Sequence, residues 1–216
     1  MHAISRSISF VSASLLCRSA SLSIGSCHSA GNLLSFTVIM RKLKTIEMNR
    51  LTVDEFRRSE KLPLVVVLDD VRSMYNVGSV FRTGDAFRIE SVCLCGISAT
   101  PPATEIHKTA LGAEDSVEWS YHADAVAAVD ELHRRGYEVY VVEQAEGSTM
   151  LSDFTFDASR RYAVVLGNEV KGVHQEVIDR CDGCIEIPQY GTKHSMNVSV
   201  TAGIIIYAFN DALRKG

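Results

Sequence analysis

The sequence lacks any stretch that is both long enough and apolar enough to cross a membrane, which excludes a helical membrane protein. It also lacks the patterns G-x-G-x-x-G and G-x-x-x-x-G-K-[ST], which excludes the commonest nucleotide-binding loops. No internal repeat is present. Acidic residues are missing from positions 1–39, and the chain as a whole lacks a positive net charge.

The segment 1–39 differs in composition from the rest of the chain. It is rich in serine, and Arg6 and Arg18 are its only charged residues, so nothing in it specifies a packed core. The composition resembles an organelle transit peptide, and the apolar patches within 10–16 resemble a secretory signal. Alternatively, it is an upstream extension before a start at Met40 or Met48. We therefore expect a leader or extension at 1–39, a lead-in at 40–61 and one folded domain at 62–216.

Six cysteines are present, two of them within 1–39. Cys93 and Cys95 alternate on an expected strand, so both side chains should face the same side of a sheet. Cys181 and Cys184 have the spacing of a redox or zinc pair, but no second such pair or histidine cluster accompanies them. Reduced structural thiols in a cytosolic protein are therefore the better interpretation.

Strand and helix patterns alternate along the chain. Apolar runs at 64–68, 91–96, 138–142, 162–166 and 184–187 predict strands, and helices are expected at 77–87, at 123–135 and after Asn197. The alternation predicts an α/β sheet with helices on both faces, whose ligands lie beyond the carboxyl ends of the strands. Three segments that follow strand ends should therefore converge on one rim: 143–144, 167–168 and Pro188.

The last helix carries apolar residues on two faces. The first set with helical spacing is Val198, Ala202, Ile205, Phe209 and Ala212, and the set on the neighbouring face is Val200, Ile204 and Tyr207. Such a helix either lies deep in the fold or packs against a second subunit. Ser195 or Asn197 can cap its first turn.

Three short motifs, in order, resemble those of the SpoU methyltransferases, which belong to the SPOUT class. The first is Asn-Val-Gly-Ser-Val-Phe-Arg-Thr at 76–83, the second is Leu-Gly-Asn-Glu at 166–169, and the third joins Ile187-Pro188 with Ser-Met-Asn-Val-Ser-Val at 195–200. The resemblance covers about 62–209. It implies methyl transfer from S-adenosylmethionine to a ribose 2′-hydroxyl of RNA. It also implies a parallel sheet whose C-terminal segment forms a trefoil knot.

The resemblance places the cofactor against backbone groups and apolar side chains of the strand ends and the third-motif loop. The implied positions are Val142, Glu143, Gln144, Leu166, Gly167, Asn168, Gly172, Ile187, Pro188, Ser195, Met196 and Asn197. Methyl transfer from a sulfonium to a hydroxyl is an in-line displacement that requires close positioning. It requires no metal, and we expect no metal site.

The resemblance also assigns Arg82 to the activation of the ribose hydroxyl. A guanidinium is a poor base, so orienting the hydroxyl or clamping the adjacent phosphate is easier to justify. Asn76 is expected to cap its helix, to hold the catalytic loop, or to do both. For Glu169, fixing the knot loop through backbone amides is preferred over accepting a proton.

From Met48 onward, 17 basic residues stand against 25 acidic ones, a net charge of −8 that is unusual for an RNA-binding protein. RNA should therefore contact a local patch or a second subunit, and the candidate cations are Arg72, Arg82, Arg88, Lys171 and Lys193. Lys193 and His194 depart from the small or acidic residues commoner in the third motif, which leaves the RNA identity open. The minimal architecture favours transfer RNA over ribosomal RNA. The alternative is a catalytically silent RNA-binding or assembly protein on the same fold.

We expect a homodimer whose site is completed across the interface, with the C-terminal helices near the two-fold axis. A charge placed at Ile205 or Phe209 should then separate the subunits. The expected location is the cytoplasm, or an organelle if 1–39 is a transit peptide.

Overall fold

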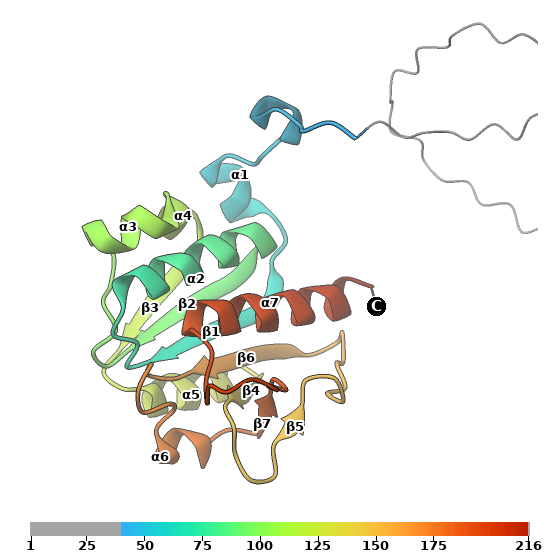
Figure 1. Ribbon diagram of the computed structural model, residues 1–216. Helices are drawn as coiled ribbons and strands as arrows, with labels where there is room; N and C mark the ends of the chain where they lie inside the picture. The colour runs from blue at the N-terminus through green and yellow to red at the C-terminus, as the bar shows by residue number, and fades with distance from the viewer. Residues whose placement is uncertain (1–39, 216) are drawn as a thin grey trace, which may run out of the picture. The chain divides into compact units, whose positions relative to one another are not determined.

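The computed structural model describes residues 40–215, of which 45–215 build a seven-stranded sheet flanked by helices (Figure 1). The strand order is β3-β2-β1-β6-β4-β7-β5, and every strand pairing among these residues is parallel. The strands are β1 (Leu62–Asp69), β2 (Ile89–Cys95), β3 (Glu118–His122), β4 (Tyr137–Val142), β5 (Thr149–Met150), β6 (Arg161–Leu166) and β7 (Gly183–Glu186). The helices are η1 (Thr45–Met48), α1 (Val53–Arg58), α2 (Met74–Phe87), α3 (Thr104–Ala110), α4 (Ala113–Ser116), α5 (Ala125–Arg134), α6 (Gln175–Ile178) and α7 (Val198–Lys215).

Helices cover both faces of the sheet, as the alternating pattern predicted. Leu64, Val66 and Leu68 of β1 enter a core that includes buried residues of α2 and α7. Val65 and Val67 enter the other core, which includes α5 and α6. Because both faces are covered, β1 is an almost continuous apolar run rather than an alternating one. Cys93 and Cys95 both lie in the second core, which confirms that they face the same side.

Two helix starts set the geometry of the site. Helix α2 begins at Met74, and its N-cap is Ser73, whose side chain accepts a hydrogen bond from the Asn76 N–H. The prediction that Asn76 caps this helix is therefore wrong, and its buried side chain is available for other contacts. At α7 the expected cap is present, because Asn197 Oδ1 accepts the Ser199 N–H at 2.9 Å.

The two apolar faces of α7 have different environments. Val198, Ile205 and Phe209 are buried in the core, whereas Val200 is 53% exposed and Tyr207 is 58% exposed. The choice of Ile205 and Phe209 as subunit-contact positions is therefore wrong, because both are fully covered within one chain. The face that remains available to a partner is the one with Val200, Ile204 and Tyr207.

The expectation of a leader at 1–39 concerns a segment outside the described residues. Within 40–215, no helix combines the length and apolar character that a membrane span requires. The trefoil knot stays a prediction from the family resemblance.

Candidate active site

A cleft of about 480 Å³ lies beyond the carboxyl ends of β4, β6 and β7. All cofactor positions expected from the sequence line this cleft except Pro188 and Asn197. We call it the first cleft. Its further lining residues, which the motifs did not assign to the cofactor, are Glu169, Val170, Lys171, Val173, Gln189, His194, Val198 and Thr201. These further residues are motif residues or their sequence neighbours. The loop after β4 meets the loop before α7 where Gln144 Nε2 donates a hydrogen bond to the His194 carbonyl at 3.1 Å.

The loop after β6 is folded around the side chain of Asn168. Its Oδ1 accepts the N–H groups of Val170 at 2.9 Å and Lys171 at 3.1 Å, and its Nδ2 donates to the Asp70 carbonyl at 2.8 Å. Asn168 and Gly172 also exchange two backbone hydrogen bonds of 3.0 and 2.9 Å. The loop is therefore closed on itself and attached to the end of β1.

Asn76, Glu169 and Asn197, one from each motif region, form a hydrogen-bonded chain beside the first cleft. Asn76 Nδ2 donates to Glu169 Oε1 at 3.0 Å, and Asn76 Oδ1 accepts from Asn197 Nδ2 at 3.1 Å. The structure thus gives Asn197 a role in joining motifs rather than in lining the cleft. Because the amide of Asn76 uses both its donor and its acceptor here, its orientation is fixed.

The Glu169 carboxylate is also held by backbone. It accepts the N–H groups of Arg72 and Ser73, each at 3.0 Å. Burial alone would raise the pKa of Glu169, but these backbone hydrogen bonds, together with that of Asn76, outweigh burial and lower the pKa. Glu169 is thus kept ionised as a loop anchor, which supports the structural role over a role as proton acceptor.

Arg82 does not line the first cleft. It lies six positions after Asn76 on α2, and six residues rotate a helix by about 240° beyond full turns, so the two side chains point in different directions. Arg82 instead lines a second cleft of about 250 Å³ between α1, α2 and the α3–α4 region. The other residues of this second cleft are Leu51, Thr52, Val53, Phe56, Asp85, Ala110, Leu111, Gly112, Ala113 and Ser116.

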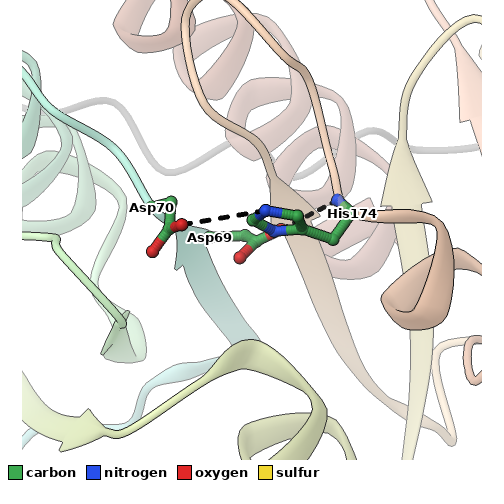
Figure 2. A group of neighbouring side chains, drawn as sticks. All are labelled: Asp69, Asp70 and His174. Atoms are coloured by element: carbon green, nitrogen blue, oxygen red, sulfur yellow. Dashed lines mark hydrogen bonds and ion pairs between the residues drawn. The ribbon is translucent and has the colours of Figure 1, made fainter.

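Asp69, Asp70 and His174 gather near the first cleft, with the imidazole between the two carboxylates (Figure 2). Carboxylate and imidazole are ligands for divalent metals, but here both ring nitrogens face a carboxylate. Nδ1 is 2.9 Å from Asp69 Oδ2, Nε2 is 3.8 Å from Asp70 Oδ2, and Asp69 Oδ2 also accepts the His174 N–H at 3.0 Å. His174 therefore connects the segment after the β6 loop to the end of β1.

Cys181 and Cys184 have the environment of structural thiols. Burial, with the nearby Asp182 carboxylate, raises the pKa of Cys181 to about 12, and burial also raises the pKa of Cys184. A reactive or metal-binding cysteine requires the opposite shift. Cys184 donates to the Glu143 carbonyl at 3.3 Å, so it supports a loop that lines the first cleft.

Comparison with known proteins identifies the family of this chain. Residues 63–207, well over half of the chain, match the SpoU rRNA Methylase family. The chain belongs to this family. A Staphylococcus haemolyticus relative, assigned to the TrmH family of tRNA/rRNA methyltransferases, is 32% identical over 158 residues. The match covers 71% of this chain and 62% of the relative, so the chain spans less than two thirds of the length of that relative.

Solved structures of similar proteins confirm the predicted fold class. The TrmH/SpoU tRNA modifying enzyme of A. aeolicus has a TM-score of 0.67 and 25% identity, and the match covers 76% of this chain and 81% of that one. The AdoMet-bound rRNA methyltransferase of Sinorhizobium meliloti has a TM-score of 0.64 and 25% identity, with coverage of 72% and 62%. The SpoU motifs of this chain therefore lie on the parallel sheet with helices on both faces that was expected.

Proposed function

We propose that this protein transfers a methyl group from S-adenosylmethionine to a ribose 2′-hydroxyl of RNA. The observation that carries the proposal is the hydrogen-bonded chain of Asn76, Glu169 and Asn197 beside the first cleft. These residues are up to 121 positions apart, yet they meet next to the residues expected for the cofactor. The three motif regions therefore meet at the cleft to which the family resemblance assigns the cofactor.

The first cleft fits S-adenosylmethionine in size and in chemistry. A volume of about 480 Å³ is typical of a small-molecule site, and Leu166, Ile187 and Met196 offer apolar surface to an adenine ring. Glu143 brings a carboxylate to the cleft, which complements a cationic ligand. The β6 loop adds backbone groups held in place by Asn168. When bound, S-adenosylmethionine supplies an electrophilic methyl group on a sulfonium.

The residues of this chain would position the acceptor and exclude water. Asn76 and Glu169 fix the start of α2 against the β6 loop, so the walls of the cleft keep their spacing during transfer. Lys171 and His194 line the cleft and would contact the RNA. Arg82 would orient the ribose hydroxyl or clamp the adjacent phosphate, because a guanidinium is a poor base but a strong phosphate ligand.

We further propose that Arg82 reaches the cofactor of a second subunit. Within one chain it lines the second cleft, and no hydrogen bond or ion pair among the described residues engages its guanidinium. The exposed apolar face of α7 supplies a contact surface for that subunit, and α7 packs beside α2 (Figure 1). A dimer would thus bring a guanidinium to each first cleft.

Complementation between two inactive variants tests both proposals. Arg82→Ala removes the guanidinium, and Ser195→Trp fills the first cleft from an exposed loop position. If the site is shared between subunits, the mixed dimer contains one intact site and regains about half of the wild-type rate. If each site lies within one chain, the mixed dimer stays inactive. Transfer of tritiated methyl groups to bulk tRNA measures the rate, with each variant alone as control.

Transfer RNA is the proposed substrate class. The similar A. aeolicus protein is described as a tRNA modifying enzyme, and its match extends over 81% of that chain. Mapping of 2′-O-methylation across total RNA, with and without the gene, identifies the nucleotide. A protein that binds cofactor and RNA but leaves the map unchanged would instead be the catalytically silent binding protein.

A further inference from the structure

The second cleft has two kinds of wall. Leu51, Val53 and Leu111 form an apolar rim, with exposed fractions of 49%, 41% and 62%, over the buried ring of Phe56. Arg82 and Asp85 add one charge of each sign. The Asp85 carboxylate accepts a hydrogen bond from the Ser116 hydroxyl at 2.6 Å, so it is fixed in direction. The cleft therefore suits a flat, partly apolar ligand that also carries an anionic group.

The backbone holds one of these rim residues in an unusual conformation. Leu111 has a φ of +54°, in the left-handed region that non-glycine residues rarely adopt, and its side chain is directed to solvent. It ends α3 by donating its N–H to the His107 carbonyl at 2.9 Å, and glycine or asparagine would do this with less strain. Arg88 ends α2 in the same conformation, so the helix end accounts for the φ of Leu111, whereas its 62% exposed side chain adds apolar surface to the rim of the second cleft.

The segment 45–58, which contributes residues to the second cleft, carries no net charge in a chain that is otherwise acidic. Between 45 and 58 three basic residues stand against three acidic ones, whereas the chain from Met48 onward carries a net charge of −8. Arg57 and Arg58 end α1, and Arg50 precedes it. A polyanion would thus find its local cations at the segment that forms one wall of the second cleft.

We propose that the second cleft binds one unpaired nucleotide of the RNA substrate, a neighbour of the nucleotide that is methylated; this inference rests on the proposed function. The base lies against Leu51, Val53 and Leu111, and its phosphate is bound by Arg82. A volume of about 250 Å³ admits a single base and excludes a base pair. Asp85 can accept a hydrogen bond from an amino group of the base. The substrate is therefore a loop or another single-stranded segment.

The test uses the full chain and exposed rim positions. The double variant Leu51→Ser/Leu111→Asn removes apolar surface, and asparagine tolerates the left-handed conformation. The matched control is Ile97→Asn, which removes an apolar side chain that is 64% exposed and lies outside the cleft. Fluorescence anisotropy follows a labelled single-stranded RNA octamer of mixed sequence, the same octamer as a duplex, and bulk tRNA. Calorimetry measures S-adenosylmethionine binding.

We expect the double variant to bind the single strand and bulk tRNA about tenfold more weakly, since loss of base stacking has this size. Cofactor affinity and melting temperature should equal those of the control, and the duplex should bind weakly to all proteins. A double variant that binds single strands as the control does overturns the inference, as does one whose subunit state changes. Whatever the double variant does, the proposed function stands if the wild type methylates RNA. If the wild type binds no RNA, the proposed function and the nucleotide site both fail.

Discussion

At the scale of single residues, Glu169 is a carboxylate whose charge the backbone stabilises. Its oxygens accept from Arg72, Ser73 and Asn76, and its pKa lies below the usual value because these hydrogen bonds outweigh the effect of burial. A lowered folded-state pKa means that the ionised form contributes stability above the unfolded value of 4.5. That contribution disappears as the pH falls through the folded-state pKa.

We predict that Glu169→Gln lowers the free energy of unfolding near neutral pH by about 0.5 to 1 kcal/mol, allowing for solvent screening of an exposed group. This equals a fall in melting temperature of about 1 to 4 °C. The difference from wild type should shrink in acid, because the wild-type carboxylate becomes protonated there. Thermal melts from about pH 7 to about pH 3 measure it. Glu146→Gln, in an exposed turn, is the control. A difference in melting temperature between wild type and Glu169→Gln that does not depend on pH contradicts the prediction.

At the scale of elements, the β6 loop passes so closely over the next segment that it tolerates no side chain at Gly167. A Cβ there would lie 2.2 Å from the Gly172 carbonyl carbon and 2.2 Å from the Val173 nitrogen. Both are backbone atoms held by hydrogen bonds, Gly172 to Asn168 and Val173 to Glu143. The glycine that a motif match would assign to the cofactor is therefore required first by the fold.

We expect Gly167→Ala to destabilise the protein by about 1 to 3 kcal/mol, the usual cost of overpacking, and to abolish cofactor binding. Gly191→Ala is the matched control, because a Cβ at that loop glycine meets no heavy atom within 4 Å. Chemical denaturation gives the stability, and calorimetry with S-adenosylmethionine gives the affinity. If Gly167→Ala and Gly191→Ala have the same free energy of unfolding and the same cofactor affinity, the close backbone approach at Gly167 is not required.

At the scale of the whole molecule, the subunit state depends on which face of α7 is left uncovered. Val200 and Tyr207 are exposed, while the other apolar stripe of the helix is buried in its own core. Tyr207 makes an edge contact with Phe87 of α2, with ring centroids 6.0 Å apart, and is otherwise available to a partner. Isolated exposed apolar residues are ordinary, but a helical row of them is typical of an interface.

We predict that Tyr207→Glu yields a folded monomer that binds cofactor but does not methylate RNA, because Arg82 of a second subunit is then absent. Light scattering reads the mass, and methyl transfer is measured on the same sample. The control is Met150→Glu, which places the same charge on an exposed apolar position of β5. A wild type that is monomeric and active would refute the dimer.

The sequence alone determined the α/β sheet, the rim on which the strand-end loops meet and the two-faced character of α7, while the resemblance of its motifs to the SpoU family named most of the residues of the first cleft. It could do so because apolar runs mark strands, and because the loops that follow parallel strands meet on one rim. Periodicity shows which residues share a face, but it does not show which face the core covers, so Ile205 and Phe209 were misassigned. Tertiary structure alone decided that Ser73 rather than Asn76 caps α2, which frees Asn76 to join Glu169 to Asn197. It also placed Arg82 in a cleft of its own, since contacts between distant segments depend on how the helices pack.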